Sequence, residues 1–246
     1  MPKSFFIDTS RCIACRGCQI ACKEWHELPA NQTRQQGSHQ NPPDLNPNNY
    51  KVLRFSEYLD GDAVRWVFFP DQCRHCQDPP CISVGGSLVD GAMIHDPQTG
   101  AVVYTEKTSK ISEKDFEDIL SACPYNIPRR NPKTGRISKC DMCFDRVSHG
   151  LVPVCVKTCP TGAMNFGERK EILDMANARL AEVKKTFPKA MLADADSVSV
   201  VYLLTDDPQK YYKFSVAQND SGMDRKMFFA QLFRPVRKSA SSVLRG

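Results

Sequence analysis

The residues of this chain best suited to chemistry are its twelve cysteines, which stand in groups with short internal spacings. One group is Cys12, Cys15, Cys18 and Cys22; another is Cys73, Cys76 and Cys81; the last is Cys140, Cys143, Cys155 and Cys159. Cys123 stands apart and precedes a proline, as Cys159 does. Thiolates at such spacings are suited to binding metal, because the thiolate is the metal-ligating form of cysteine.

The spacing C-x2-C-x2-C-x3-C of residues 12–22 is that of a bacterial ferredoxin run. In such a run three cysteines hold one [4Fe–4S] cluster and the fourth ligates another. A pseudo-symmetric pair of triplets then exchanges fourth ligands, and the unpaired cysteines complete a further cluster. This predicts a first site of Cys12, Cys15, Cys18 and Cys159, a second site of Cys140, Cys143, Cys155 and Cys22, and a third site of Cys73, Cys76, Cys81 and Cys123.

Two other cysteine chemistries compete with this interpretation. Disulfides fit poorly, because closely spaced triplets cannot pair internally without strain. Structural zinc could use the C-x2-C pairs, as in a zinc-stabilised interaction module. Zinc explains neither the run at residues 12–22 nor the two Cys-Pro steps, so iron–sulfur chemistry is favoured. The same twelve cysteines would be iron ligands, and the sequence shows no paired nucleophile and base for a catalytic centre.

Hydrophobic periodicity predicts the elements that position these cysteines. Strands are expected at Ser4–Ile7, Gly100–Thr105 and Ser197–Leu204, a hairpin at Tyr50–Phe55 and Ala63–Phe69, and helices at Cys18–Glu27, Glu113–Cys123 and Glu168–Phe187. Residues 29–49 are rich in Asn, Gln and Pro and are expected to form a long loop.

Length and charge exclude several classes of protein. The chain has 246 residues and a net charge of +5, but residues 222–246 alone hold six basic side chains and one acidic one. A basic tail on an otherwise neutral chain does not favour nucleic acid as a partner. No run of about 20 apolar residues predicts a membrane span, and the N-terminus lacks an apolar signal-peptide core. Met227–Phe233 could form a short amphipathic helix, with disorder as the alternative.

An internal repeat links two parts of the chain. The segment from Cys155 to Met164 resembles the segment from Cys81 to Met93, in which Gly85 takes the place of the fourth cysteine. Cys123 keeps the proline that follows such a cysteine but lacks the preceding triplet. Both losses would remove ligands from one cluster, so the pattern indicates an ancestor with four clusters.

Several other side chains stand beside the cysteines. Lys23, Arg74, His75, Lys139 and Lys157 are either cations that raise cluster potentials or ordinary surface cations. Trp25 and Tyr125 are expected to pack in the core, with filling of the space between clusters as the alternative. His26, His39, His95 and His149 show no ligand-like grouping in the sequence.

Three segments carry a resemblance to a known family: Gln72–Cys81, Cys123–Pro128 and Ser138–Cys143. With the cysteine groups, they resemble the iron–sulfur subunit of molybdopterin oxidoreductases over about residues 3–170. The segment Cys15–Trp25 with Leu28–Ala30 is most similar to the β subunit of soluble tungsten or molybdenum formate dehydrogenases of sulfate-reducing bacteria. The implied fold is α+β, with duplicated bacterial ferredoxin-like domains, short strands, loops and a C-terminal helix.

The resemblance implies an electron-transfer subunit of an oxidoreductase complex with no catalytic centre of its own. Three [4Fe–4S] clusters would pass electrons from a catalytic subunit, which holds tungsto- or molybdopterin in a heterodimer, to a cytochrome c or ferredoxin. The implied order runs from the first site through the second to the third. Another pterin enzyme of the family, acting on polysulfide, thiosulfate, nitrate or DMSO, is the alternative.

The expected organisation has three parts. Residues 1–170 form the cluster-binding region with the 29–49 insertion, 171–215 a helix–strand extension packed on it, and 216–246 the basic tail. The resemblance implies a periplasmic location reached by co-export with the catalytic subunit, and the cytoplasm is the alternative.

Overall fold

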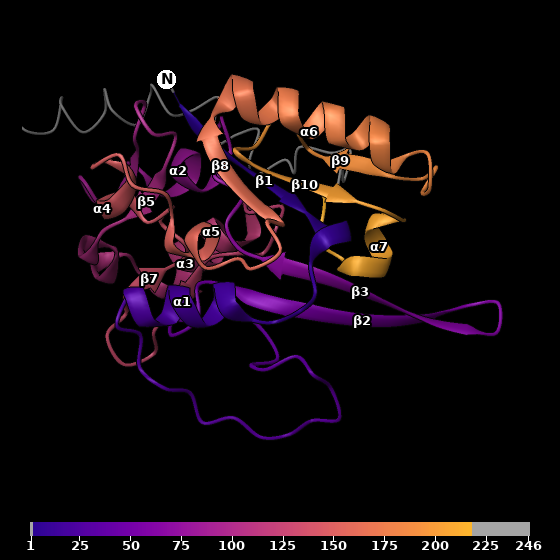
Figure 1. The fold of residues 1–246 in the computed structure, drawn as a ribbon. Helices are drawn as coiled ribbons and strands as arrows, with labels where there is room; N and C mark the ends of the chain where they lie inside the picture. Colours follow the sequence, from indigo (N-terminus) through magenta and orange to yellow (C-terminus); the bar gives the residue numbers. More distant parts are fainter. Residues whose placement is uncertain (1, 218–246) are drawn as a thin grey trace, which may run out of the picture.

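The computed structural model describes residues 2–217, and at its centre is a four-stranded sheet (Figure 1). In spatial order the strands are β8 (Met164–Glu168), β1 (Lys3–Asp8), β10 (Val200–Leu204) and β9 (Met191–Ala193). β1 runs parallel to β10, with Phe5 opposite Val200, and antiparallel to β8. The two middle strands therefore come from near opposite ends of the described chain.

Both faces of this sheet are covered, which explains why β10 is apolar and buried along its whole length. α6 (Arg169–Val183) packs on one face (Figure 1). Phe6 of β1 joins the buried side chains of α6 in one cluster. On the other face Phe5 lies in one cluster with Cys18 and Cys155. Because successive side chains of a strand point to opposite faces, β1 contacts α6 with one face and supports the cysteine loops with the other.

The predicted hairpin is present as β2 (Val52–Asp60) and β3 (Ala63–Asp71), with Asp60 opposite Ala63. Gly61 has φ +60°, which a two-residue hairpin turn requires and glycine adopts without strain. At the base, the Tyr202 hydroxyl donates to the Pro70 carbonyl oxygen at 2.7 Å. The exposed tip extends away from the body of the molecule (Figure 1).

Two pairs of helices frame the cysteine loops. The α1/α5 half consists of α1 (Gly17–Trp25) packed against α5 (Val154–Lys157). The α2/α3 half consists of α2 (Pro80–Gly85) packed against α3 (Glu113–Ser121). Together with the short strands, these halves confirm the predicted α+β fold built on a duplicated unit.

The remaining elements of the described chain are short. They are η1 (Thr9–Arg11), β4 (Met93–His95), β5 (Val102–Tyr104), η2 (Glu106–Lys110), β6 (Arg129–Arg130), β7 (Ile137–Ser138), α4 (Phe144–Val147) and α7 (Pro208–Tyr211). Residues 29–49 contain no helix or strand, only a bridge between Asn46 and Asn49, as predicted for a long loop.

Most predicted elements agree with the structure to within a few residues. The helix expected to reach Cys123 ends at Ser121, because a residue that precedes a proline is disfavoured in helical conformation. None of the helices in residues 2–217 is long and apolar enough to cross a bilayer. The possible amphipathic segment Met227–Phe233 lies outside the described residues.

Candidate metal centres

Each of the three sites begins with a short loop, and the loops share one backbone conformation. The residue before the second cysteine has a positive φ in every loop: 58° at Ala14, 47° at His75 and 69° at Met142. Residues with a side chain rarely adopt this region, at a cost of about 1–3 kcal/mol each. The same strained conformation at three equivalent positions indicates that the three loops are shaped for the same kind of bound group.

The left-handed residue directs its backbone N–H toward the first cysteine of the loop. The His75 amide donates to Cys73 Sγ at 3.4 Å. The equivalent pairs of amide and sulfur are Ala14 with Cys12 and Met142 with Cys140. Amides directed at a sulfur stabilise its anionic, metal-binding form, so each loop provides an anion-binding turn.

Cys123 and Cys159, which both precede a proline, also share a geometry. The amides of the second and fourth residues after each cysteine donate to its sulfur. The residue between these two amides is left-handed in both segments, with φ 51° at Asn126 and 64° at Gly162. The two segments are therefore equivalent in structure as well as in sequence.

Each remote cysteine is influenced by the thiolates of a particular group. Burial raises the pKa of the Cys22 thiol well above its ordinary value, and three neighbouring thiolates raise it further. These three are Cys140, Cys155 and Cys143. After burial, the thiolates that raise the pKa of Cys12 are Cys159 and Cys15, and those that raise the pKa of Cys123 are Cys73 and Cys81. Mutual repulsion of this kind is expected where thiols converge on one site.

The third-site cysteines line one cavity. The other lining residues are Arg74, Pro79, Pro80, Val102, Tyr104, Pro124, Tyr125, Ile127, Pro128 and Lys139. The Tyr104 side chain neighbours Cys81: burial, and after it the Cys81 thiolate, raise the pKa of the Tyr104 hydroxyl. Four thiols around a largely apolar cavity, with donors directed at them and no carboxylate among the lining residues, fit a [4Fe–4S] cluster held by four thiolates.

The three sites differ in exposure. Cys15 of the first site is exposed, and Cys12 and Cys159 are half-buried. All four second-site cysteines are buried, whereas Cys76 and Cys123 of the third site are half-buried. The second site is therefore interior, while each of the other two approaches the surface.

Thiolates also interact between neighbouring sites. The Cys155 thiolate acts on Cys18, which joins the second site to the first. The Cys73 thiolate acts on Cys140, which joins the third site to the second. Together with the burial of the second site, these interactions indicate a row of sites with the buried site in the middle.

The five side chains noted beside the cysteines fall into two groups. Arg74, His75 and Lys139 are buried, with 2%, 0% and 6% exposure, so they are not surface cations. Lys157 is exposed, and Lys23 is half-buried with its ammonium directed at backbone carbonyls. The sequence alone could not separate these groups, because each residue stands one or two positions from a cysteine.

Two side chains at the sites were not predicted from the sequence. Lys51, 2% exposed, interacts with thiolates of the first and second sites. Tyr104 reaches the third site from β5. Neither residue lies near a cysteine in the sequence, and a lysine before a strand carries no pattern that marks it as buried.

Two sequence expectations were wrong. Trp25 was expected in the core but is 42% exposed, and its indole N–H donates to Asp145 at 2.9 Å. His26 was expected to have no ligand-like grouping, yet its Nε2 lies 3.8 Å from Cys143 Sγ and 3.4 Å from an Asp141 oxygen. Because Cys143 belongs to the second site, we interpret His26 as a neighbour of that ligand sulfur. Tyr125 is buried, as predicted.

At the lost fourth cysteine, Gly85 lies against filled space. A Cβ built there would be 2.8 Å from Ile119 Cδ1 and 2.9 Å from Met93 Sδ. Ile119 and Met93 belong to a buried apolar cluster of the α2/α3 half. A hydrophobic core therefore fills the region where the repeat would otherwise place another metal site.

Comparisons with known proteins agree with this geometry. A family model described as "4Fe-4S dicluster domain" matches residues 64–169. The chain is 62% identical over 216 residues to "Formate dehydrogenase 2 subunit beta (cytochrome c-553)" of Nitratidesulfovibrio vulgaris, which covers 87% of this chain and 99% of the relative.

Two further relatives extend the similarity. A formate dehydrogenase subunit beta of Megalodesulfovibrio gigas is 49% identical over 88% of this chain and 100% of the relative. The iron–sulfur subunit of the nitrate-inducible formate dehydrogenase of Escherichia coli is 36% identical over 84% of this chain and 70% of the relative.

Proposed function

The chain belongs to the iron–sulfur β subunits of formate dehydrogenases, and on this premise we propose that it carries electrons from a pterin–metal catalytic subunit to an external acceptor. It works as an electron-transfer subunit of an oxidoreductase complex. The observation that carries the proposal is the row of three four-cysteine sites, buried in the middle and approaching the surface at both ends.

We assign one [4Fe–4S] cluster to each site, with the ligand sets that the cysteine spacing predicts. When bound, such a cluster accepts and returns single electrons. The chain's own contribution is to hold four thiolates at each site and to direct backbone amides at their sulfurs. Burial of all four second-site thiols also keeps bulk solvent away from the middle of the row.

We propose that electrons enter at the first site and leave from the third. The exposure of Cys15 supports a contact between the first site and the catalytic subunit. The half-buried Cys76 and Cys123 support an exit at the third site. The printed name of the Nitratidesulfovibrio relative includes cytochrome c-553, so a cytochrome c is the acceptor we propose, with a ferredoxin as the alternative.

The organisation and location of the chain are part of the same proposal. Residues 171–215 form an extension packed on the cluster-binding region 1–170, and 216–246 are a basic tail. The pairing of β10 with β1 supports close packing of the extension. We place the heterodimer in the periplasm, which cell fractionation tests: recovery of the complex with cytoplasmic markers would contradict it.

The decisive test is anaerobic purification of this chain with its bound partner, followed by addition of formate. We expect about twelve iron atoms per chain and loss of the cluster absorbance on adding formate. If dithionite bleaches the clusters and formate does not, the partner acts on another substrate. If the chain holds zinc and no iron, the electron-transfer proposal fails.

A further inference from the structure

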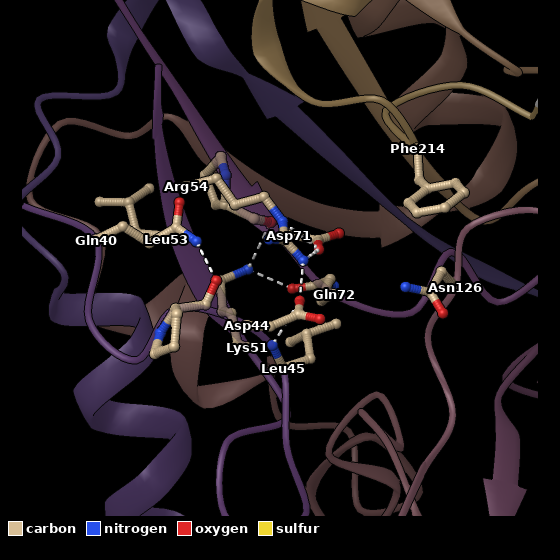
Figure 2. A network of polar contacts seen from close by, with 12 residues as sticks. Gln40, Asp44, Leu45, Lys51, Leu53, Arg54, Asp71, Gln72, Asn126 and Phe214 are labelled. Carbon is tan, nitrogen blue, oxygen red and sulfur yellow. Dashed lines mark hydrogen bonds and ion pairs between the residues drawn. The ribbon is translucent and has the colours of Figure 1, made fainter. Parts of the chain in front are cut away.

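Two buried lysines differ from the buried arginines near them. Arg54 and Arg74 share the buried carboxylate of Asp71. Arg54 Nη2 lies 2.8 Å from one of its oxygens (Figure 2), and Arg74 Nη1 lies 3.0 Å from the other. Within residues 2–217 no carboxylate pairs with Lys51 or Lys139, whose ammonium groups donate to neutral oxygens. A buried ammonium is costly unless negative charge lies near it.

Lys139 lies between the second and third sites. Its Nζ donates at 3.0 Å to the carbonyl oxygen of Cys140, a second-site residue. The same side chain lines the third-site cavity, where its Nζ is 4.6 Å from the centre of the Tyr104 ring. Burial alone would lower the pKa of Lys139, but the thiolates of Cys73, Cys81 and Cys140 raise it, and Asp141 acts more weakly.

Lys51 has the corresponding place between the first and second sites. It lies directly before β2, and its ammonium donates to the Gln72 side-chain oxygen (Figure 2) and, at 3.5 Å, to the Pro70 carbonyl oxygen. The Pro70 carbonyl oxygen also accepts from the Tyr202 hydroxyl at 2.7 Å, and Tyr202 lies in one buried cluster with Cys18 and Cys155. Burial alone would lower the pKa of Lys51, but the thiolates of Cys18 and Cys155 raise it. One of these cysteines belongs to the first site and the other to the second.

We propose that these two lysines are shared electrostatic links, Lys51 between the first and second sites and Lys139 between the second and third. The inference rests on the proposed function, because it concerns clusters at those sites. Reduction adds one negative charge to a site, and a fixed ammonium beside it stabilises the reduced form. A lysine that lies beside two sites therefore raises the reduction potential of both.

This arrangement predicts a different pattern for each lysine. Lys139→Gln lowers the potentials of the second and third clusters and leaves the first unchanged. Lys51→Gln lowers those of the first and second and leaves the third unchanged. We expect about a tenfold change in the reduction equilibrium at each affected cluster, which is about 59 mV for one electron.

The experiment is an anaerobic redox titration of the purified complex with mediators, followed by electron paramagnetic resonance. Signals are assigned to sites from those lost in Cys12→Ala and Cys73→Ala variants. Lys157→Gln is the matched control, because Lys157 stands two residues from both Cys155 and Cys159 but is exposed, and we expect no shift. The Lys139→Arg and Lys51→Arg variants keep the positive charge. Their reduction equilibrium constants should therefore stay within about twofold of those of the wild type.

Unchanged potentials in a fully iron-loaded Gln variant overturn the proposal, and so does an equal shift of all three clusters. If a Gln variant loads less iron, the loss should fall on the same two sites and be restored by Arg. If the Arg variant does not restore the iron content, a role for the positive charge is contradicted. Because mediators set the potential, these outcomes do not depend on formate. A failure of the lysine proposal is therefore distinguishable from a failure of the proposed function.

Discussion

The α1/α5 half and the α2/α3 half follow one backbone plan but fill their interiors differently. Phe116 and Ile119 stand at the same sequence distances before Cys123 as Cys15 and Cys18 do before Cys22. In the α1/α5 half these positions carry cysteines, whereas Phe116 and Ile119 are buried in an apolar cluster. The comparison shows that a duplicated unit can exchange a metal site for a hydrophobic core while keeping its helices.

The two halves also differ at the N-termini of α1 and α3. α1 begins after Arg16, which is left-handed with φ 61° and provides no side-chain cap. α3 begins after Ser112, whose hydroxyl accepts from the Asp115 amide at 3.1 Å. Where the cysteine loop is absent, an ordinary N-cap starts the helix instead.

The largest effect is expected from removing a ligand inside the α1/α5 half. Cys155→Ala should remove a cluster, or about four iron atoms per chain, and nearly abolish formate-driven reduction of the acceptor, because the second site is the middle of the row. Iron analysis and acceptor assays on the purified complex measure both. Rapid acceptor reduction without the second cluster would contradict the proposed path.

A corresponding change at the third site should have a narrower effect. In Cys73→Ala, formate should still reduce the first and second clusters, while reduction of the acceptor slows, because the third site is the proposed exit. Stopped-flow absorbance of the clusters and of cytochrome c separates the two steps. Equal loss of both would show that electrons do not leave from the third site.

The core that replaces the metal site should be sensitive to its central residue. Ile119 is fully buried, so Ile119→Ala should destabilise the holo chain by about 2–5 kcal/mol through the cavity it leaves. Anaerobic urea unfolding followed by circular dichroism measures this. Leu120→Ala, at the next and half-buried position, is the control and should cost less. Similar losses for both would mean that Ile119 has no special place in this core.

The sequence predicts the parts of these sites that depend on local spacing. A C-x2-C turn is encoded within four residues, so the loops and the two Cys-Pro segments can be recognised in the sequence alone. Lys51 and Tyr104 could not, because their burial depends on how β2 and β5 pack against distant loops. The prediction for Trp25 was wrong because it followed an average preference. An aromatic residue at a helix end favours the core on average, but here the indole N–H donates to Asp145 at the surface.

Gly85 should tolerate a side chain poorly, because its position faces filled space. Gly85→Ala should cost about 1–3 kcal/mol by overpacking against Ile119 and Met93. The double variant Gly85→Ala with Ile119→Val should recover part of that loss, and a double-mutant cycle of urea midpoints measures the coupling. Gly167→Ala, whose Cβ would meet nothing closer than 3.7 Å, is the control. If the stability changes caused by the two substitutions are strictly additive, the two positions do not compete for space.

The smallest expected effect concerns the cap that distinguishes α3 from α1. Ser112→Ala removes the acceptor for the Asp115 amide and should destabilise the chain by about 1 kcal/mol, with all iron retained, because the cap lies far along α3 from Cys123. Urea midpoints and iron content are the measurements, and Ser112→Asp, which keeps an acceptor, is the control. If Ser112→Ala instead lost third-site iron, the cap would contribute to positioning Cys123. The two halves would then resemble each other more closely, since the start of the helix would support a ligand in both.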